Sequence, residues 1–175
     1  MRASMKRQKI FLLLSPSESI IKYVAELKVR VRNILGHEYD SYHSKAHISL
    51  LMHYLNHAEN FLYHVDDKMH QVNPFTLVVK NLNVFHHGPN LRTIYLEVVN
   101  KTSACELCEK LVGQPNQFVP HITIARKLSI DEFNKVWSEL KHLSYSNYFR
   151  CDRLTVLKWR DNKWNHHIDI PFSDN

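Results

Sequence analysis

The chain has 175 residues, a length suited to one compact domain or to two small lobes that share a core. Its 44% apolar content excludes a disordered chain, and its longest apolar run, residues 10–14, is far shorter than a transmembrane helix requires. Lysine and arginine outnumber aspartate and glutamate by 23 to 17, which favours anionic partners such as phosphate groups, with ordinary surface charge as the alternative. Only three glycines are present, which excludes a glycine-rich phosphate-binding loop.

No long apolar stretch follows the basic N-terminal residues, so we expect no signal peptide and a cytoplasmic location. Three cysteines are too few for a secreted disulfide framework. Cys105 and Cys108 have the spacing of a metal-binding pair, but no second pair of matching spacing accompanies them. We interpret them as structural thiols on a helix, with a zinc or redox role as the alternative.

Apolar periodicity predicts alternating strands and helices through the first half of the chain. Between Ile20 and Ile34 apolar residues recur at three- and four-residue steps, and Gly36 stands where such a helix would end. The expected elements are a strand at 9–14, a helix over 20–34, a strand at 47–52, a helix from 56 to 69, and a strand at 75–80 that pairs with a neighbour around 84–85.

The second half repeats this order of elements. A capping box formed by Ser129 and Glu132 marks the beginning of one of its helices. The expected elements are a strand at 93–99, a helix over 104–113, a strand at 121–124, a helix after 129, a strand around 149, and two final strands at 153–159 and 164–170 joined by a polar turn.

This repetition has a fixed offset: His47 and His121 are 74 residues apart, and so are Phe75 and Phe149 in the strands that follow them. It predicts an α/β fold of the α+β kind, duplicated and two-lobed, with pseudo-twofold symmetry. Mainly antiparallel sheets would line a central cleft, with helices outside. We expect a single domain over 1–175, with lobes at about 9–90 and 91–170 and with exchange of strands between the lobes allowed.

Two short motifs occupy equivalent strands of the two halves, each with the pattern His, aliphatic, hydroxyl, aliphatic. The first is His47-Ile48-Ser49-Leu50, and the second is His121-Ile122-Thr123-Ile124. Because side chains alternate along a strand, each histidine shares a face with its hydroxyl residue while the aliphatic side chains anchor the strand behind them. Two such pairs that converge across a twofold axis suit a phosphodiester. The alternative is that both histidines are structural.

The motifs resemble those of the two-histidine (2H) phosphoesterase superfamily, in particular its bacterial branch of 2′-5′ RNA ligase-like, 2′,3′-cyclic phosphodiesterases. Residues 120–126, Pro-His-Ile-Thr-Ile-Ala-Arg, look very like the second motif of that branch, including its arginine. The resemblance implies a duplicated α/β fold, activity on RNA ends or cyclic nucleotides, and no cofactor. It also implies that His47 is the acid and His121 the base.

The side chains themselves fit this chemistry. Imidazole has an ordinary pKa near 6.5, so it can serve as a general acid or a general base at neutral pH. Ser49 and Thr123 can donate hydrogen bonds to phosphoryl oxygens, and Arg126 or Lys45 can add positive charge. Four aromatic residues are candidates to stack on a base, although each is more often a core residue: Tyr42, Tyr95, Phe85 and Trp159.

Three classes of function stay open at this point. The leading one is a metal-independent phosphoesterase that hydrolyses 2′,3′-cyclic phosphates, joins 2′-5′ RNA ends, or does both. The second is a non-catalytic module on the same fold that binds RNA or nucleotide phosphates. The third is a metal-binding protein that uses some of the 13 histidines. We expect RNA ends or cyclic nucleotides as partners, no membrane, no metal requirement and a monomer.

Overall fold

The structure is a computed structural model that describes residues 7–115 and 117–173. The basic N-terminal residues 1–6 lie outside this part of the chain. The predicted α+β class is confirmed, since the described residues form two four-stranded antiparallel sheets and four helices. The elements are β1 (Gln8–Leu14), α1 (Glu18–Leu35), β2 (Ile48–Leu55), α2 (Ala58–Met69), β3 (Phe75–His87), β4 (Leu91–Val98), α3 (Thr102–Val112), β5 (His121–Ser129), α4 (Ile130–Leu140), β6 (Ser146–Cys151), β7 (Arg153–Arg160) and β8 (Lys163–Pro171).

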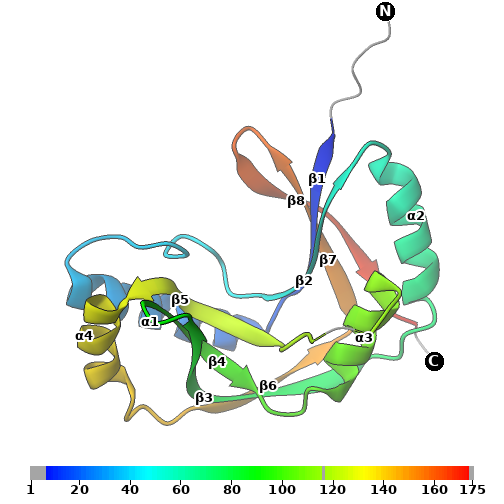
Figure 1. The fold of residues 1–175 in the computed structure, drawn as a ribbon. Coiled ribbons are helices and arrows are strands. Elements are labelled where there is room, and N and C mark those ends of the chain that lie inside the picture. The colour runs from blue at the N-terminus through cyan, green and yellow to red at the C-terminus, as the bar shows by residue number, and fades with distance from the viewer. Residues whose placement is uncertain (1–6, 116, 174–175) are drawn as a thin grey trace, which may run out of the picture.

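The two sheets have matching strand orders. The first sheet runs β2-β1-β7-β8, and the second runs β5-β4-β3-β6. Figure 1 shows the first sheet standing upright beside the second, which lies across the base of the molecule. The sheets exchange strands, because β3 from the first half joins the second sheet while β7 and β8 complete the first. A boundary near residue 90 therefore does not separate the two sheets.

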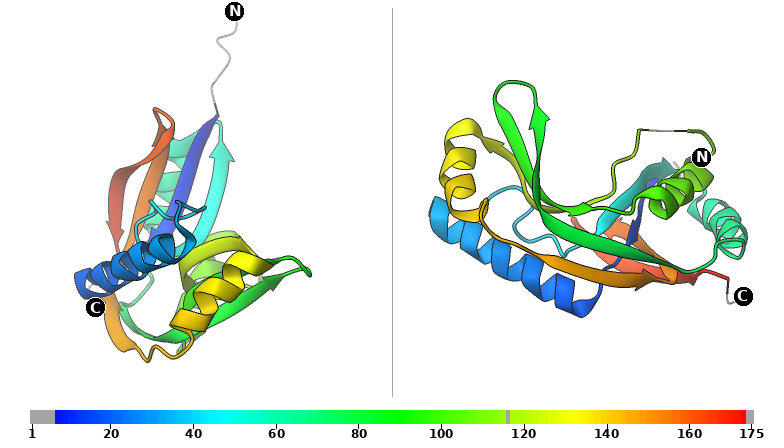
Figure 2. Two further views of the ribbon diagram at one scale, coloured as in Figure 1. Left: turned by 90° about the vertical axis from the view of Figure 1, so that its left-hand side faces the viewer. Right: turned by 90° about the horizontal axis from the view of Figure 1, so that it is seen from below.

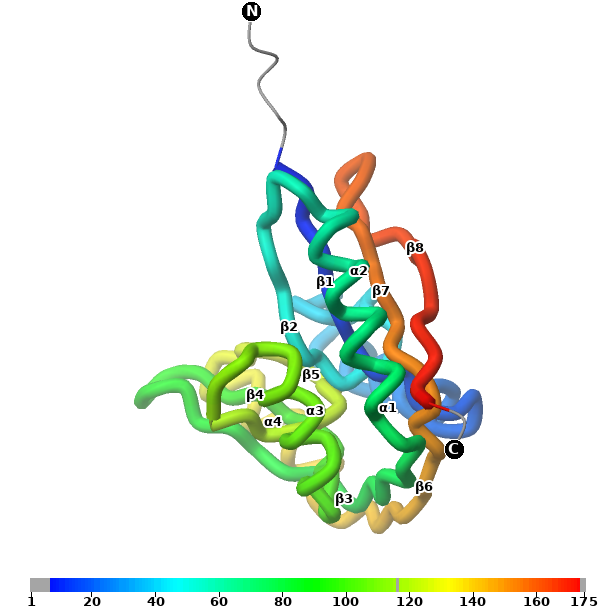
Figure 3. Tube along the Cα trace, turned by 90° about the vertical axis from the view of Figure 1, so that its right-hand side faces the viewer, coloured from blue at the N-terminus to red at the C-terminus, as the bar shows by residue number. Residues whose placement is uncertain are grey.

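The helices are exchanged in the same way. Helix α1 packs against β5 and α4 (Figure 2), whereas α3, its counterpart in the second half, packs against β2. Helix α2 contacts α3 and β8, and it runs along the first sheet in Figure 3. Each half thus covers the histidine strand of the other half, so the two sheets share one continuous apolar core.

Several local features follow from the sequence as predicted. Helix α4 begins with the complete capping box, in which Ser129 Oγ accepts from the backbone of Glu132 and the Glu132 carboxylate accepts from Ser129. Helices α1 and α3 end at Gly36 and Gly113, whose φ angles of 79° and 81° are left-handed. The polar turn between β7 and β8 is a two-residue hairpin loop.

One element differs from the prediction. Residues 75–87 form one strand, β3, rather than a strand that pairs with a neighbour around 84–85. The strand bends at Asn81, where φ is 30° and the pairing with β4 is irregular. Asn81 is held by two hydrogen bonds with the backbone of Tyr145, one from its own N–H and one to its side-chain oxygen, both 3.0 Å long.

No helix among the described residues combines the length and the apolar character needed to cross a lipid bilayer.

Candidate active site

The two histidine motifs lie at the beginnings of two strands that contact each other. His47 directly precedes β2, His121 is the first residue of β5, and these strands meet between the sheets. Alternation along each strand gives Ser49 the face of His47 and Thr123 the face of His121. The residue between each pair is a fully buried isoleucine. The fold therefore brings the four motif residues to one region.

Both imidazoles are anchored in the same way. His47 Nδ1 lies 2.7 Å from the carbonyl oxygen of Lys45, and His121 Nδ1 lies 2.7 Å from the carbonyl oxygen of Val119. A carbonyl can only accept, so each Nδ1 carries the proton of that hydrogen bond. This tautomer leaves Nε2 of each ring as the atom that can take or give a proton.

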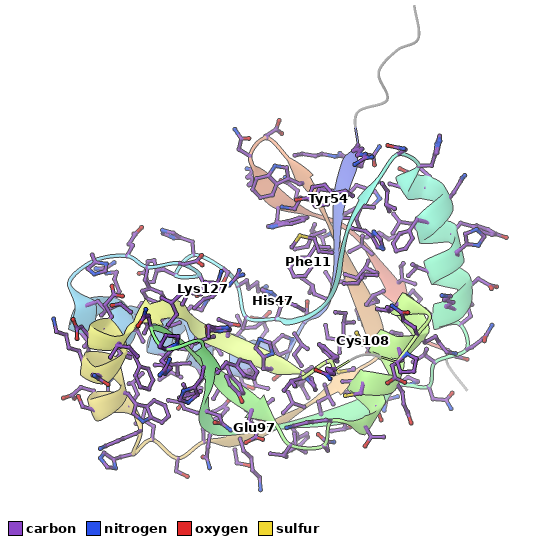
Figure 4. The ribbon with its side chains drawn as sticks, viewed as in Figure 1. Phe11, His47, Tyr54, Glu97, Cys108 and Lys127 are labelled. Atoms are coloured by element: carbon purple, nitrogen blue, oxygen red, sulfur yellow. The ribbon has the colours of Figure 1, made fainter. Side chains whose placement is uncertain are left out.

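Each imidazole also contacts an aromatic ring of the neighbouring strand edge to face. Phe11 of β1 meets His47 edge to face, with centroids 5.3 Å apart, and Figure 4 shows the two residues next to each other. Tyr95 of β4, the counterpart strand, meets His121 at 5.4 Å, and Phe85 of β3 meets it at 4.8 Å. Each imidazole is therefore held by a backbone carbonyl and by aromatic contacts, one ring for His47 and two for His121.

The electrostatic surroundings of the two histidines differ. Burial lowers the pKa of both imidazoles, and the backbone hydrogen bond of each partly opposes that effect. The pKa of His47 is lowered further by the positive charges of Lys28 and His121. The two imidazoles thus interact electrostatically, and an anion bound near both would favour their protonated forms.

Lys28 is a component of this region that the sequence analysis missed. Its side chain is only 3% exposed, and Nζ donates to the Ser41 carbonyl at 2.6 Å and to the Ser44 carbonyl and hydroxyl at 2.7 and 2.8 Å. Burial lowers its pKa to about 8. The signal was available, because Lys28 lies on the apolar stripe of α1 between Val24 and Val31.

Arg126 lies on β5 and points toward the loop that precedes His47. Its Nε is 3.9 Å from Asp40 Oδ2, and both side chains are more than half exposed. An ion pair this exposed contributes little to stability. The guanidinium therefore remains accessible to a stronger anion.

The two tyrosines expected to stack on a base have different positions. Tyr42 is half-buried on the loop before His47, where its hydroxyl accepts from Arg32 at 3.1 Å, and it lines a cavity of about 300 Å³ together with Lys28 and Lys45. Tyr95 is only 6% exposed and is stacked on Phe85 at 4.0 Å. The register of β4 with β5 buries the Tyr95 ring between Phe85 and His121.

Among the described residues, no group of three or more His, Cys, Asp or Glu side chains is placed to hold a metal ion. Cys105 and Cys108 both lie on α3, and burial raises the pKa of Cys105.

Proteins with detectable sequence similarity are named as phosphoesterases. The "Putative phosphoesterase" of Bacillus pumilus is 33% identical over 95 residues, which cover 51% of this chain and 54% of that protein. A protein of the same description from Halalkalibacterium halodurans is 31% identical over 97 residues, covering 52% of this chain and 56% of that protein. The chain thus matches little more than half the length of these relatives.

Solved structures share the fold along almost the whole chain. E. coli LigT complexed with ATP aligns with a TM-score of 0.64 and 12% identity, covering 97% of this chain and 99% of LigT. Kluyveromyces marxianus Usb1 with uridine monophosphate aligns with a TM-score of 0.59 and 10% identity, covering 96% and 99%. At these identities the similarity shows the two-lobed fold.

The family itself is shown by the sequence. The model of the 2′-5′ RNA ligase superfamily matches residues 16–163, a segment that includes both histidine motifs. The chain therefore belongs to the 2′-5′ RNA ligase superfamily, the two-histidine phosphoesterases.

Proposed function

We propose that the protein is a metal-independent phosphoesterase that acts on RNA ends and hydrolyses 2′,3′-cyclic phosphates. The observation that carries the proposal is the matched pair of imidazoles. Each Nδ1 lies 2.7 Å from a backbone carbonyl oxygen, and each histidine is followed two positions later by a hydroxyl residue. Structures with this fold have been determined with 3′-AMP and phosphate, in the case of LigT, and with uridine monophosphate, in the case of Usb1. Those ligands support a nucleotide phosphate as the substrate group.

In the proposed reaction, the oxygen of a water molecule forms a bond to phosphorus while one ribose oxygen of the cyclic ester leaves. Nε2 of His121 takes the proton from water, and Nε2 of His47 gives a proton to the leaving oxygen. The product is a ribose monophosphate, with His121 protonated and His47 neutral until a proton exchange with solvent restores the starting state. Each general acid or base contributes on the order of 10²–10⁴-fold.

The negative charge of the phosphoryl group is balanced by the neighbouring donors. The hydroxyls of Ser49 and Thr123 donate to the non-bridging oxygens, and the guanidinium of Arg126 supplies positive charge. The lowered pKa of His47 makes its protonated form the stronger acid, as a proton donor requires, and the anionic substrate supplies the attraction that protonates it.

The same arrangement of residues can also catalyse the joining of two RNA ends. If a ribose hydroxyl replaces water as the nucleophile, the two histidines exchange protons in the same way and a phosphodiester forms instead of a monophosphate. A non-catalytic module that binds RNA or nucleotide phosphates is the alternative, in which the phosphate binds between the histidines without turnover.

Turnover of a 2′,3′-cyclic mononucleotide in the presence of EDTA tests the proposal. We expect hydrolysis by the wild-type protein and at least 100-fold lower kcat in His47→Ala and His121→Ala. The matched control is His53→Ala, which removes an exposed histidine from β2 itself. Circular dichroism checks that each variant folds.

Tight binding of the nucleotide without turnover would establish the non-catalytic alternative. Activity that EDTA abolishes would contradict metal independence, and a threefold or smaller effect of either alanine variant would contradict the paired-histidine mechanism.

A further inference from the structure

An exposed aromatic cluster lies on the first sheet, outside the four motif residues. Tyr54 of β2 is 59% exposed and Trp159 of β7 is 42% exposed, and both stand near the half-buried Trp164 of β8. The ammonium of Lys9 lies 5.4, 5.1 and 5.0 Å from the centroids of these three rings. We call these four residues the aromatic platform.

The platform is on the same face of the first sheet as Phe11, the residue whose ring contacts His47. Lys9 pairs with Tyr54 across β1 and β2, and Trp159 pairs with Trp164 across β7 and β8, so the members of each pair share a face. Lys9 and Phe11 are two residues apart on β1 and also share a face. Figure 4 shows Tyr54, Phe11 and His47 in succession along this side of the molecule.

The platform is also continuous with the candidate active site through ring contacts. His47 contacts Phe11, Phe11 contacts Trp164, and Trp164 contacts Trp159, each with 5.3 Å between centroids. These ring contacts connect His47, through the buried Phe11, to the exposed Trp159, so a chain molecule whose end lies at His47 can reach the platform along this face.

The composition of the platform identifies the class of ligand. Proteins bind single-stranded nucleic acids with exposed aromatic rings that stack on bases and with cations that track the phosphates. A dry apolar partner surface is disfavoured here, because covering the platform would bury the charge of Lys9 without an anion. The formal charge of +6 also favours an anionic strand.

We propose that the nucleotides preceding the terminal phosphate of an RNA strand run along this face, with Tyr54 and Trp159 stacked on bases and Lys9 paired with a backbone phosphate. The substrate is then an oligonucleotide rather than a mononucleotide. This inference rests on the proposed function only for the position of the terminal phosphate at His47 and His121.

The test compares two substrates for each protein: a cyclic mononucleotide and a pentanucleotide that ends in a 2′,3′-cyclic phosphate. The measured quantity is the ratio of kcat/KM for the pentanucleotide to kcat/KM for the mononucleotide. Trp159→Ala and Tyr54→Ala should each lower this ratio about 5- to 150-fold, the loss expected for one base–aromatic stack. Trp159→Phe, which keeps a ring, should restore most of it.

Two controls make the result specific. Tyr63→Ala removes a 74% exposed tyrosine from α2 and should leave the ratio unchanged. Lys9→Gln should reduce the slope of log(kcat/KM) against log salt for the pentanucleotide by about 0.7, the contribution of one phosphate of a single strand. An unchanged ratio in both Trp159→Ala and Tyr54→Ala would overturn the inference.

A binding measurement separates this inference from the proposed function. Fluorescence anisotropy of a labelled pentanucleotide ending in a 3′-phosphate requires no turnover, so weaker binding by Trp159→Ala supports the platform even if the wild type hydrolyses neither substrate. Equal binding by wild type and Trp159→Ala contradicts the platform, whatever the activity. If Trp159→Ala changes only self-association in sedimentation, the face is an interface between copies of the chain and the inference is wrong.

Discussion

The ammonium of Lys28 lies 2.7 Å from the carbonyl oxygen of Ser44, three residues before His47. Together with its bonds to the Ser44 hydroxyl and the Ser41 carbonyl, this contact ties the loop that carries His47 to the buried face of α1. The same ammonium lowers the pKa of His47 by its charge. Lys28 therefore acts on the candidate site through position and through electrostatics.

We predict that Lys28→Met lowers kcat and raises the pKa of His47. The substitution removes the donor of the Ser44 carbonyl, while the Ser41 carbonyl keeps the hydroxyl and the backbone N–H of Ser44, and the loss should also reduce the free energy of unfolding by about 1–3 kcal/mol. NMR titration of the His47 ring measures the pKa, and a merely structural role for Lys28 would leave that pKa in place. Lys22→Met, at an exposed position of the same helix, is the matched control.

The roles of the two histidines can be separated with a leaving group that needs no proton. With a nucleoside 3′-(p-nitrophenyl phosphate), attack by the 2′-hydroxyl releases p-nitrophenolate directly, so the proton donor is dispensable and the acceptor is not. This cyclisation is the reverse of ring opening, so His47 takes the proton from the ribose hydroxyl and His121 faces the leaving group. We predict that His121→Ala keeps activity within about 10-fold of wild type on this ester, whereas His47→Ala loses at least 100-fold. The reverse pattern would exchange the two roles.

The duplicated fold and its short-range features could be predicted from the sequence, whereas the pairing of individual strands could not. The capping box at Ser129 and the helix end at Gly36 depend on residues within a few positions, so the sequence specified them directly. The bend of β3 at Asn81 depends on Tyr145, 64 residues away. Strand exchange also depends on which strands pair, a choice that apolar periodicity does not encode.

The same distinction applies to the candidate site. The two motifs were visible because each spans four residues with the period of a strand. The burial of Tyr95 could not be predicted, because it depends on the register with Thr123 in β5 and on the approach of Phe85 from β3. Lys28 was overlooked although its place on the apolar stripe of α1 marked it as a buried charge.

The stability of the protein should fall as the pH is lowered through the range in which histidines titrate. The folded-state pKa values of His47 and His121 lie below the ordinary value of 6.5, so the unfolded chain takes up protons first. The stability that depends on neutral His47 and His121 is therefore fully present above about pH 6.5, and it decreases as the pH falls toward the lowered pKa values. Thermal unfolding between pH 5 and 8 measures this dependence.

Burial also lowers the pKa of His167, which therefore contributes to the pH dependence in the same range. The double variant His47→Gln, His121→Gln is compared with wild type in order to isolate the contribution of the two site histidines. The pH dependence of the melting temperature should be smaller in the double variant than in wild type. Inorganic phosphate, which favours the protonated imidazoles, should stabilise wild type more at pH 5.5 than at pH 8. Identical pH profiles for the two proteins would contradict the assignment.

The hydroxyl of Thr123 gives the last prediction, because this residue offers three closely matched side chains. Thr123→Val keeps the shape of the side chain and removes the hydroxyl. It should lower kcat/KM roughly 10- to 150-fold, which corresponds to about 1.5–3 kcal/mol of transition-state stabilisation, as expected for loss of a hydrogen bond to a charged group. Thr123→Ser keeps the hydroxyl and should stay within a few-fold of wild type. Ser49→Ala should have an effect similar to Thr123→Val, since the two positions are equivalent in the duplicated fold. Steady-state kinetics on a 2′,3′-cyclic nucleotide provides the measurement, and equal activity of Thr123→Val and Thr123→Ser would show that the hydroxyl does not contact the phosphoryl group.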